Sequence, residues 1–223
     1  TFPLGATTVT WTVTDGAGLT ATATQVVTVE DNINPVAITQ DITVNLDANG
    51  SATITASQID NSSTDNCSIS TYALDVTTFT CSNLGANTVN LTVTDVAGNT
   101  NTTSAIVTVE DNINPVAITQ DITVNLDANG SATITASQID NSSTDNCSIS
   151  TYALDVTTFT CSDLGANTVN LTVTDAAGNT NTTSATVTVV DNITPTISAP
   201  AAVTVDVDAG LCTTALSNVT LGS

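Results

Sequence analysis

The sequence predicts an all-β protein built of small β-sandwich domains arranged end to end. Three observations support this: a strand-forming composition, a long internal repeat, and short segments in which apolar and polar residues alternate. The chain of 223 residues is 40% hydrophobic and rich in valine, isoleucine, leucine and threonine, which favour strands. The repeat, which takes residues 31–110 into 111–190, is too long for one turn of a solenoid and fits a small sandwich.

Residues 31–110 and 111–190 are two copies of one unit, called here the first and second repeat. Residues 1–30 match the second half of the unit, and residues 191–223 match its first half. We therefore expect a half domain, two complete domains and another half domain, in a chain that belongs to a longer protein. The two complete copies differ at four positions only: Asn83/Asp163, Val96/Ala176, Ile106/Thr186 and Glu110/Val190.

Alternating patterns predict the strands of each unit. The segments DITVNLD and SATITAS flank the turn Ala48-Asn49-Gly50, which predicts a hairpin. SISTYAL and TTFTC follow as separate strands. Residues 87–95 and 101–110 are expected to pair as an antiparallel hairpin around Gly98. Its inward side chains include Val89, Leu91 and Val93.

The charge of the chain is extreme, with 21 acidic residues and no lysine, arginine or histidine. A net charge of −21 argues against nucleic acid or an anionic membrane as a partner. No apolar run is long enough to span a bilayer. Without a basic side chain there is no general base near neutral pH and no cation to stabilise an oxyanion. We therefore expect no enzymatic activity.

The acidic segment EDNINP, which ends at Pro35 and again at Pro115, separates consecutive units. Proline forces the residue before it into an extended conformation, which suits a linker that enters the next domain. If each sandwich has an odd number of strands, its two ends lie at opposite poles. The linker, the D-x-A-G-N turn after residue 94 and the loop with Asp60, Asp65 and Asn66 then lie at one pole. The turn at Asp47 lies at the other, facing the next linker.

Carboxylates from several loops therefore converge at each joint, meaning the contact region between two consecutive units. Ca²⁺ takes six to eight oxygen ligands from such groups, which predicts a calcium site. The alternative stays open, because aspartate and asparagine are also good turn residues. Asp41 and Asp75 are expected to be only solvated, and the Asp65 loop is outside the favoured ligand set. That set is Asp31, Asn32, Asp47, Asp95, Asn99, Glu110, Asp111, Asn112, Asp127, Asp175, Asn179 and Asp191.

Several motifs carry a family resemblance. FPLGATTVTWTVTDGAG, TDNC, VTDVAGNT and VEDNINP resemble the hyalin repeat (HYR) and related Ig-like extracellular modules. The near-identical copies with DNC and FTCS(N/D)LG are similar to repeats of giant cell-surface adhesins of gliding Bacteroidota, of the SprB type. The linker also resembles the calcium-binding linkers of cadherins and of bacterial adhesin stalks. Leu19 departs from the D-x-x-G-N pattern, and the first half unit lacks a counterpart of Cys81.

Each complete unit has two cysteines, Cys67 and Cys81 in the first and Cys147 and Cys161 in the second. Zinc would require closer pairs or histidine, and a catalytic thiol would require a basic neighbour. We therefore expect two disulfides, Cys67–Cys81 and Cys147–Cys161, in an oxidising extracellular compartment. Cys212 stands where hyalin repeats often have a cysteine. Its partner is expected beyond Ser223, which leaves it unpaired in this chain.

Three functions compete. The first is a structural stalk or filament at the cell surface that serves adhesion and gliding. Such a stalk needs length rather than a unique site, so identical repeats favour it. Its partners are the neighbouring repeats and other adhesin chains. Direct binding of surface polysaccharide requires exposed aromatic rings, yet the aromatic residues of each unit are expected in the core: Tyr72, Phe79, Tyr152 and Phe159. An ice-binding surface requires a flat array on a short-period solenoid, and the long repeat argues against it.

Overall fold

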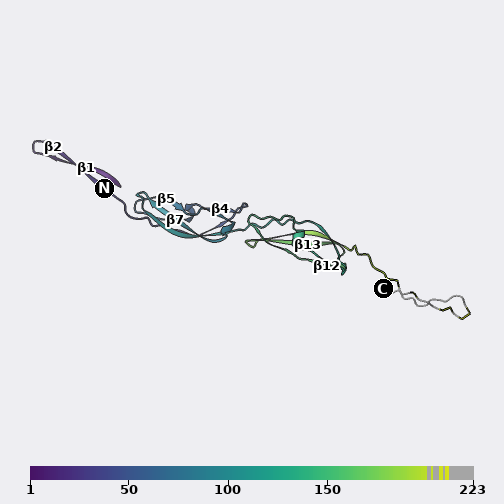
Figure 1. The fold of residues 1–223 in the computed structure, drawn as a ribbon. Helices are drawn as coiled ribbons and strands as arrows, with labels where there is room; N and C mark the ends of the chain where they lie inside the picture. The colour runs from purple at the N-terminus through teal and green to yellow at the C-terminus, as the bar shows by residue number, and fades with distance from the viewer. Residues whose placement is uncertain (200–201, 203–205, 208, 211–223) are drawn as a thin grey trace.

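The structure is a computed structural model that describes residues 1–199, 202, 206–207 and 209–210. Figure 1 shows an extended molecule in which a β-hairpin is followed by two β-sandwich domains in a row. The prediction of tandem, all-β, Ig-like domains is confirmed. The described α-helices have four residues each, and none of them is long and apolar enough to cross a membrane.

The two repeats contain the same elements in the same order. The N-terminal hairpin consists of β1 (Gly5–Thr14) and β2 (Thr20–Val29). The first repeat has β3 (Ile42–Asn45), β4 (Ser51–Thr53), α1 (Ala56–Ile59), β5 (Ile69–Leu74), β6 (Thr78–Thr80), the 3-10 helix η1 (Cys81–Asn83), β7 (Gly85–Asp95) and β8 (Thr100–Glu110). The second has β9 (Ile122–Asn125), β10 (Ser131–Thr133), α2 (Ala136–Ile139), β11 (Ile149–Leu154), β12 (Thr158–Thr160), η2 (Cys161–Asp163), β13 (Gly165–Asp175) and β14 (Thr180–Val190).

Each repeat is a sandwich of a four-stranded and a two-stranded sheet. In the first repeat the large sheet has the order β3-β8-β7-β5 and the small sheet pairs β4 with β6; the second repeat has the same order. Phe79 of the small sheet and Leu91 of the large sheet are both buried, at 1% and 0% exposure. The two hydrophobic cores are separate, and the N-terminal hairpin contributes to neither.

The β7–β8 hairpin has the predicted form. Its strands pair in an antiparallel register from Gly85↔Val109 to Thr94↔Thr100, and the turn contains Gly98 with a φ of 97°. The alternating side chains Val89, Leu91 and Val93 are fully buried, as the sequence pattern predicted. Burial of one face of this long hairpin therefore defines the orientation of the whole sandwich.

The hairpin predicted from DITVNLD and SATITAS, residues 41–57, is wrong. β3 pairs in parallel with β8, from Ile42↔Val107 to Asn45↔Glu110, while β4 pairs with β6 of the other sheet. The turn after Asp47 does form, but it carries the chain across the core, because Leu46 and Ile54 on either side of it are both buried. Each repeat has six strands rather than an odd number. Its ends still lie at opposite poles, since the first and last strands run parallel.

The expectations for four single residues are also wrong. Tyr72 and Tyr152 lie on the edge strands β5 and β11 and are 41% and 42% exposed, so neither is a core residue. The Asp41 carboxylate accepts a hydrogen bond from the Ile106 N–H at 2.7 Å. The Asp75 carboxylate accepts hydrogen bonds from the backbone and side-chain nitrogens of Asn90, at 2.8 and 2.7 Å. Both carboxylates therefore fix strand positions instead of being merely solvated.

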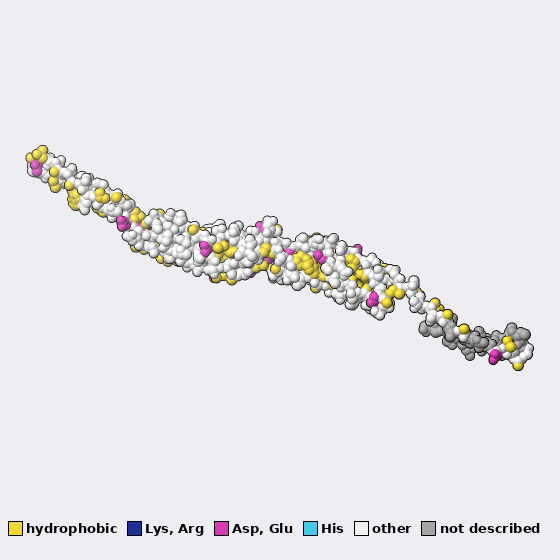
Figure 2. Space-filling model, viewed as in Figure 1, with side chains coloured by type: hydrophobic (Ala, Val, Ile, Leu, Met, Phe, Trp, Pro, Cys, Tyr) yellow, Lys and Arg dark blue, Asp and Glu magenta, His cyan; other side chains and the backbone are white. Residues whose placement is uncertain are grey.

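The N-terminal hairpin differs from the repeats in its exposure. Trp11 and Val13 are 61% and 68% exposed, although the matching residues Leu91 and Val93 are fully buried in the first repeat. Figure 2 shows hydrophobic side chains on the surface of this hairpin, and it also shows hydrophobic patches and scattered carboxylates on the complete repeats.

Candidate functional site at the joint between repeats

A disulfide joins the two repeats. Cys81 of the first repeat is bonded to Cys147 of the second, 66 residues later, while Cys67 and Cys161 are free and exposed. The predicted pairs Cys67–Cys81 and Cys147–Cys161 are therefore wrong. Cys67 lies at the end of its repeat where the linker enters, and β5 carries the chain along the sandwich before Cys81 begins η1 at the opposite end. Cys212 lies outside the described residues.

Polar contacts accompany this disulfide across the joint. The Asn146 side-chain amide donates to the backbone oxygen of Asp47 at 3.3 Å, and the Asn112 amide donates to the Asn45 side chain at 3.0 Å. Gly50 lies so close that a Cβ on it would stand 2.6 Å from Cys81 Sγ and 2.7 Å from the Asn146 backbone oxygen. The joint is thus a packed contact with a covalent bond in it, and not a free linker.

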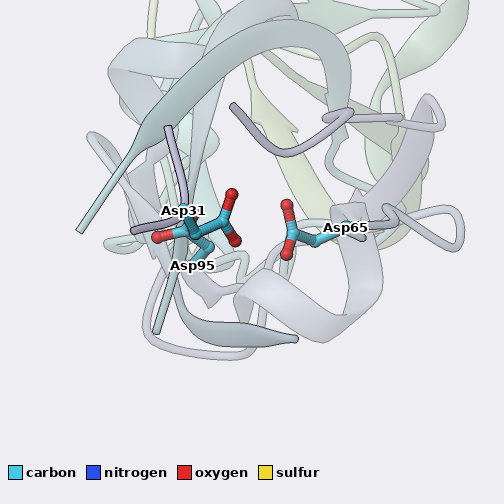
Figure 3. Close-up of side chains that lie close together, drawn as sticks. All are labelled: Asp31, Asp65 and Asp95. Carbon is cyan, nitrogen blue, oxygen red and sulfur yellow. The ribbon is translucent and has the colours of Figure 1, made fainter. Parts of the chain in front are cut away.

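Three aspartates meet at the linker end of each repeat, and we call each group a carboxylate triad. In the first repeat they are Asp31 from the linker, Asp65 from the loop after α1, and Asp95 from the end of β7. One oxygen of each lies within 4.8 Å of the others. Figure 3 shows the Asp65 carboxylate pointing toward Asp31 and Asp95. In the second repeat the same triad consists of Asp111, Asp145 and Asp175.

Local hydrogen bonds hold the triad in place. The Asp95 carboxylate accepts from the backbone N–H groups of Gly98 and Asn99 and from the Asn99 side chain, at 2.7–2.8 Å. The same Asn99 amide donates to the backbone oxygen of Asp31 at 2.9 Å, which fixes the linker against the β7–β8 turn. Asp31 Oδ1 accepts from the Ile33 N–H at 3.1 Å. The turn chemistry that the sequence offered as an alternative is therefore present.

Turn chemistry leaves part of the triads unexplained. Asp31 Oδ2 and Asp65 Oδ1 are buried and have no hydrogen-bond partner among the described residues, and the same holds for Asp111 Oδ2 and Asp145 Oδ1. Asp111 is 5% exposed. A buried polar atom without a partner costs about 1–3 kcal/mol, and more when it is charged. No described residue donates to these oxygens, and a cation or a water from outside the chain would satisfy them.

Two carboxyl groups of the first triad, those of Asp31 and Asp95, have lowered pKa values with identifiable causes. A hydrogen bond from the Ile33 backbone lowers the pKa of the Asp31 carboxyl below its usual value, and Cys67 acts in the same direction. Burial raises the pKa of Asp95, but its hydrogen bonds, with those of Asn99 the strongest, outweigh burial and lower the pKa overall. Asp31 and Asp95 therefore remain ionised side by side at neutral pH.

The predicted ligand set divides in two. Four of its aspartates lie in the triads, and Asn99 and Asn179 support them from the turn. The others lie elsewhere. The carboxylates of Asp47 and Asp127 each accept from backbone N–H groups within their own turns. Glu110 is exposed, and Asp191 accepts from the Ile193 N–H. Asn112 and Asn192 contact the preceding repeat, and Asn32 is exposed.

The favoured ligand set missed Asp65 and Asp145. The sequence placed the loop with Asp65 at the correct pole. It gave no sign that the Asp65 side chain points toward the other carboxylates. It also missed Asn146, whose buried Oδ1 has no partner among the described residues and whose amide donates to Asp111 at 3.2 Å. With the paired carboxylates, these residues provide several anionic and neutral oxygens in one place, which is the donor set that Ca²⁺ prefers.

Comparison with known proteins gives structural similarity only. No protein-family model and no curated protein matches the chain. Domains EC1-2 of human mucin-like protocadherin share 14% identity at a TM-score of 0.40, over 70% of this chain and 98% of theirs. Human protocadherin-24 EC1-2 shares 10% identity at a TM-score of 0.40, and the match covers 72% of this chain and 100% of the protocadherin chain. EC1-3 of mouse clustered PcdhgC3 shares 18% identity at a TM-score of 0.35, and the match covers 84% of this chain and 78% of the PcdhgC3 chain.

These similarities are too low to transfer a site or a function. They are also not specific to hyalin repeats or gliding adhesins, so that resemblance stays a prediction from the sequence.

We expect Gly50→Ala to weaken the joint more than Gly130→Ala weakens the second repeat. Both glycines have positive φ, 70° and 73°, which costs an L residue about 1–3 kcal/mol. At Gly50 a Cβ would also meet the backbone of Asn146, whereas at Gly130 the only near atom among the described residues is Cys161 Sγ. After reduction and reoxidation, Gly50→Ala should form the Cys81–Cys147 bond more slowly. Equal rates in the two variants would show that Gly50 has no special role at the joint.

Acid should destabilise both repeats through matching carboxylates. Hydrogen bonds from the Ser51 backbone lower the pKa of Asp47, and those from the Asn90 backbone lower that of Asp75. A folded pKa below the unfolded value of about 3.9 gives stability that is complete above it and lost as pH falls through the folded pKa. Thermal melts should therefore shift downward below about pH 4. Asp75→Asn should reduce this acid dependence, and an unchanged acid profile would contradict the assignment.

Proposed function

We propose that the chain is a segment of an extracellular stalk or filament, in which tandem repeats provide length and stiffness. The observation that carries this proposal is the Cys81–Cys147 bond, which links consecutive repeats instead of stabilising either one alone. It is supported by the parallel pairing of β3 with β8, because this pairing places the ends of a repeat at opposite poles. Repeats connected in this way extend in a row, as Figure 1 shows.

Calcium at the carboxylate triads is part of the proposal. Consecutive repeats carry eight carboxylates each and no positive group, so they repel one another. At 4 Å, two like charges repel by about 4 kcal/mol at an effective dielectric near 20. A divalent ion held by Asp111, Asp145 and Asp175 would remove this repulsion beside the joint and occupy the oxygens that lack partners. It would also fix the linker, since Asp111 is part of it.

The location and partners follow from the same features. Disulfides persist in oxidising compartments, which supports an extracellular location. The first partners of each repeat are its neighbours in the chain, and other adhesin chains are further candidates. The resemblance to adhesins of gliding Bacteroidota supports the narrower proposal that the stalk serves surface adhesion and gliding motility. No catalytic role is proposed.

Small-angle scattering on the full chain tests this function. With calcium and an intact disulfide we expect the scattering of a stiff rod. Chelator alone and reductant alone should each broaden the ensemble, and both together should give the largest change, because the ion and the bond restrain the same joint. Scattering that responds to neither treatment would mean that packing and proline alone hold the repeats, and a compact particle would rule out the stalk.

Direct binding of polysaccharide is the second candidate. One observation favours it: Tyr72 and Tyr152 are 41% and 42% exposed at equivalent positions, so aromatic rings repeat along the surface. Titration with surface polysaccharides separates the two functions. A polysaccharide-binding module should lose affinity in the Tyr72→Ala/Tyr152→Ala variant, whereas the rod-like scattering of a stalk should not change.

A further inference from the structure

The two free cysteines match the two that are bonded. When the sequences of the two repeats are aligned, Cys67 corresponds to Cys147 and Cys161 corresponds to Cys81. Each repeat therefore has one cysteine of either kind, one at the end where the linker enters and one at the opposite end. Among the described residues, a cysteine of one kind is disulfide-bonded to a cysteine of the other kind only at the joint between the first and second repeats.

The free Cys161 has the surroundings of the bonded Cys81. Its Sγ lies 3.8 Å from the Gly130 backbone oxygen, compared with 3.7 Å between Cys81 Sγ and the Gly50 oxygen. A Cβ on Gly130 would stand 2.7 Å from Cys161 Sγ, close to the 2.6 Å at Gly50. Residues 191–199, which follow the second repeat, are exposed and form no regular structure.

The free Cys67 likewise has the surroundings of the bonded Cys147. Its backbone N–H donates to Asp65 at 2.8 Å, and that of Cys147 donates to Asp145 at 2.9 Å. The neighbouring Asn66 contacts Asp31 as Asn146 contacts Asp111. Asp31 is only 9% exposed and has an oxygen without a partner at this end. The loop therefore has the bonding conformation, although the position that Cys81 holds relative to Cys147 is held, relative to Cys67, by Thr1.

We propose that Cys161 and Cys67 are complementary attachment points for further copies of this repeat, joined head to tail by the same disulfide. Cys161 accepts the loop cysteine of a following copy, and Cys67 accepts the η-helix cysteine of a preceding copy. The occupant is another copy of this repeat because the faces continue the contact already present between the first and second repeats. This inference deepens the proposed stalk and rests on it for its biological purpose.

The bond requires a two-electron oxidant, and a small-molecule disulfide such as oxidised glutathione suffices. The Cys161 thiolate attacks the glutathione disulfide and releases one glutathione thiolate. The Cys67 thiolate of the other copy then attacks Cys161 Sγ in the mixed disulfide and releases the second glutathione. Two protein thiols are oxidised to one disulfide, the oxidant is reduced to two thiols, and the two protons pass to glutathione.

The segment 31–190 is the right molecule for the test, since both hydrophobic cores lie wholly inside it. Two single variants, Cys67→Ala and Cys161→Ala, each retain one of the two attachment points. Oxidised alone at moderate salt, which screens the acidic charge, each variant should remain monomeric. Mixed together they should form one dimer, linked from Cys161 to Cys67. Peptide mass spectrometry identifies the bond, and an intact Cys81–Cys147 link in each variant shows that it is folded.

We expect mixed dimers to form at least about tenfold faster than either homodimer, equivalent to about 1.4 kcal/mol of preference. Homodimers at the same rate would overturn the proposal, because they would mean that exposed thiols react without recognition. Absence of any dimer under full oxidation would overturn it as well. Neither result would contradict the proposed stalk function, because small-angle scattering of the single chain tests that function separately.

Discussion

The double variant Cys81→Ala/Cys147→Ala should lose about 4 kcal/mol of unfolding free energy relative to the oxidised chain. The estimate comes from the entropy of closing a loop across 66 residues in the unfolded state. That is a large share of the roughly 5–15 kcal/mol that stabilises a typical domain. Denaturant unfolding of the full chain measures it, and the wild-type chain in reductant should show the same loss.

Cys67→Ala/Cys161→Ala is the matched control for this experiment. It removes the same number of sulfur atoms at equivalent positions, but neither cysteine is bonded, so stability should be almost unchanged. If the two double variants lost equal stability, the observed pairing would be wrong.

Calcium should stabilise the chain by about 2.7 kcal/mol for each occupied triad at a concentration one hundred times the dissociation constant. The physical reason is that an ion bound only by the folded state pulls the equilibrium toward it. Thermal melts with calcium and with chelator measure the shift. Magnesium should stabilise less, because it requires a smaller octahedral shell and loses water reluctantly.

Two variants with equal loss of charge make this result specific. The calcium shift should disappear when asparagine replaces two aspartates of each triad: Asp31, Asp65, Asp111 and Asp145. It should persist when asparagine replaces four aspartates outside the triads: Asp41, Asp75, Asp121 and Asp155. A calcium shift that survives the first set would place the ion elsewhere.

Sequence pattern predicted the parts of the fold that depend on local alternation. The β7–β8 hairpin is long, has one apolar face and turns at Gly98, so its register could be anticipated. The partner of β3 could not be anticipated, because the pattern of a four-residue strand next to a good turn predicts a hairpin. Its real partner, β8, is the last strand of the repeat and is selected by packing of the core.

The sequence predicted that acidic residues gather at the linker end of each repeat and named part of them, while calcium at this place stays a prediction. The linker aspartate and the D-x-A-G-N turn do meet, as Asp111 and Asp175 show. The Asp47 carboxylate was predicted as a ligand beside the next linker, but it caps its own turn, and its backbone oxygen accepts from Asn146 in the loop after α2. Acidic composition could not distinguish these roles, since both use the same residue type.

The disulfides were mispredicted for a related reason. Cys67 and Cys81 are close along the chain, but β5 and β6 lie between them, and the two cysteines end at opposite poles. The pole of each cysteine follows only from the order of strands in the sheets. Once that order is known, the near pair is Cys81 and Cys147, which belong to different repeats.

Pulling the full chain from its two ends tests the covalent joint most directly. When both repeats are fully unfolded, the oxidised chain should extend about 220–240 Å less than the reduced chain, because the bond bypasses 66 residues of about 3.3–3.6 Å each. Bonds within each repeat, Cys67–Cys81 and Cys147–Cys161, would bypass two much shorter segments and shorten the chain by only about 100 Å. That smaller difference, or none, would contradict a stalk whose repeats are covalently joined.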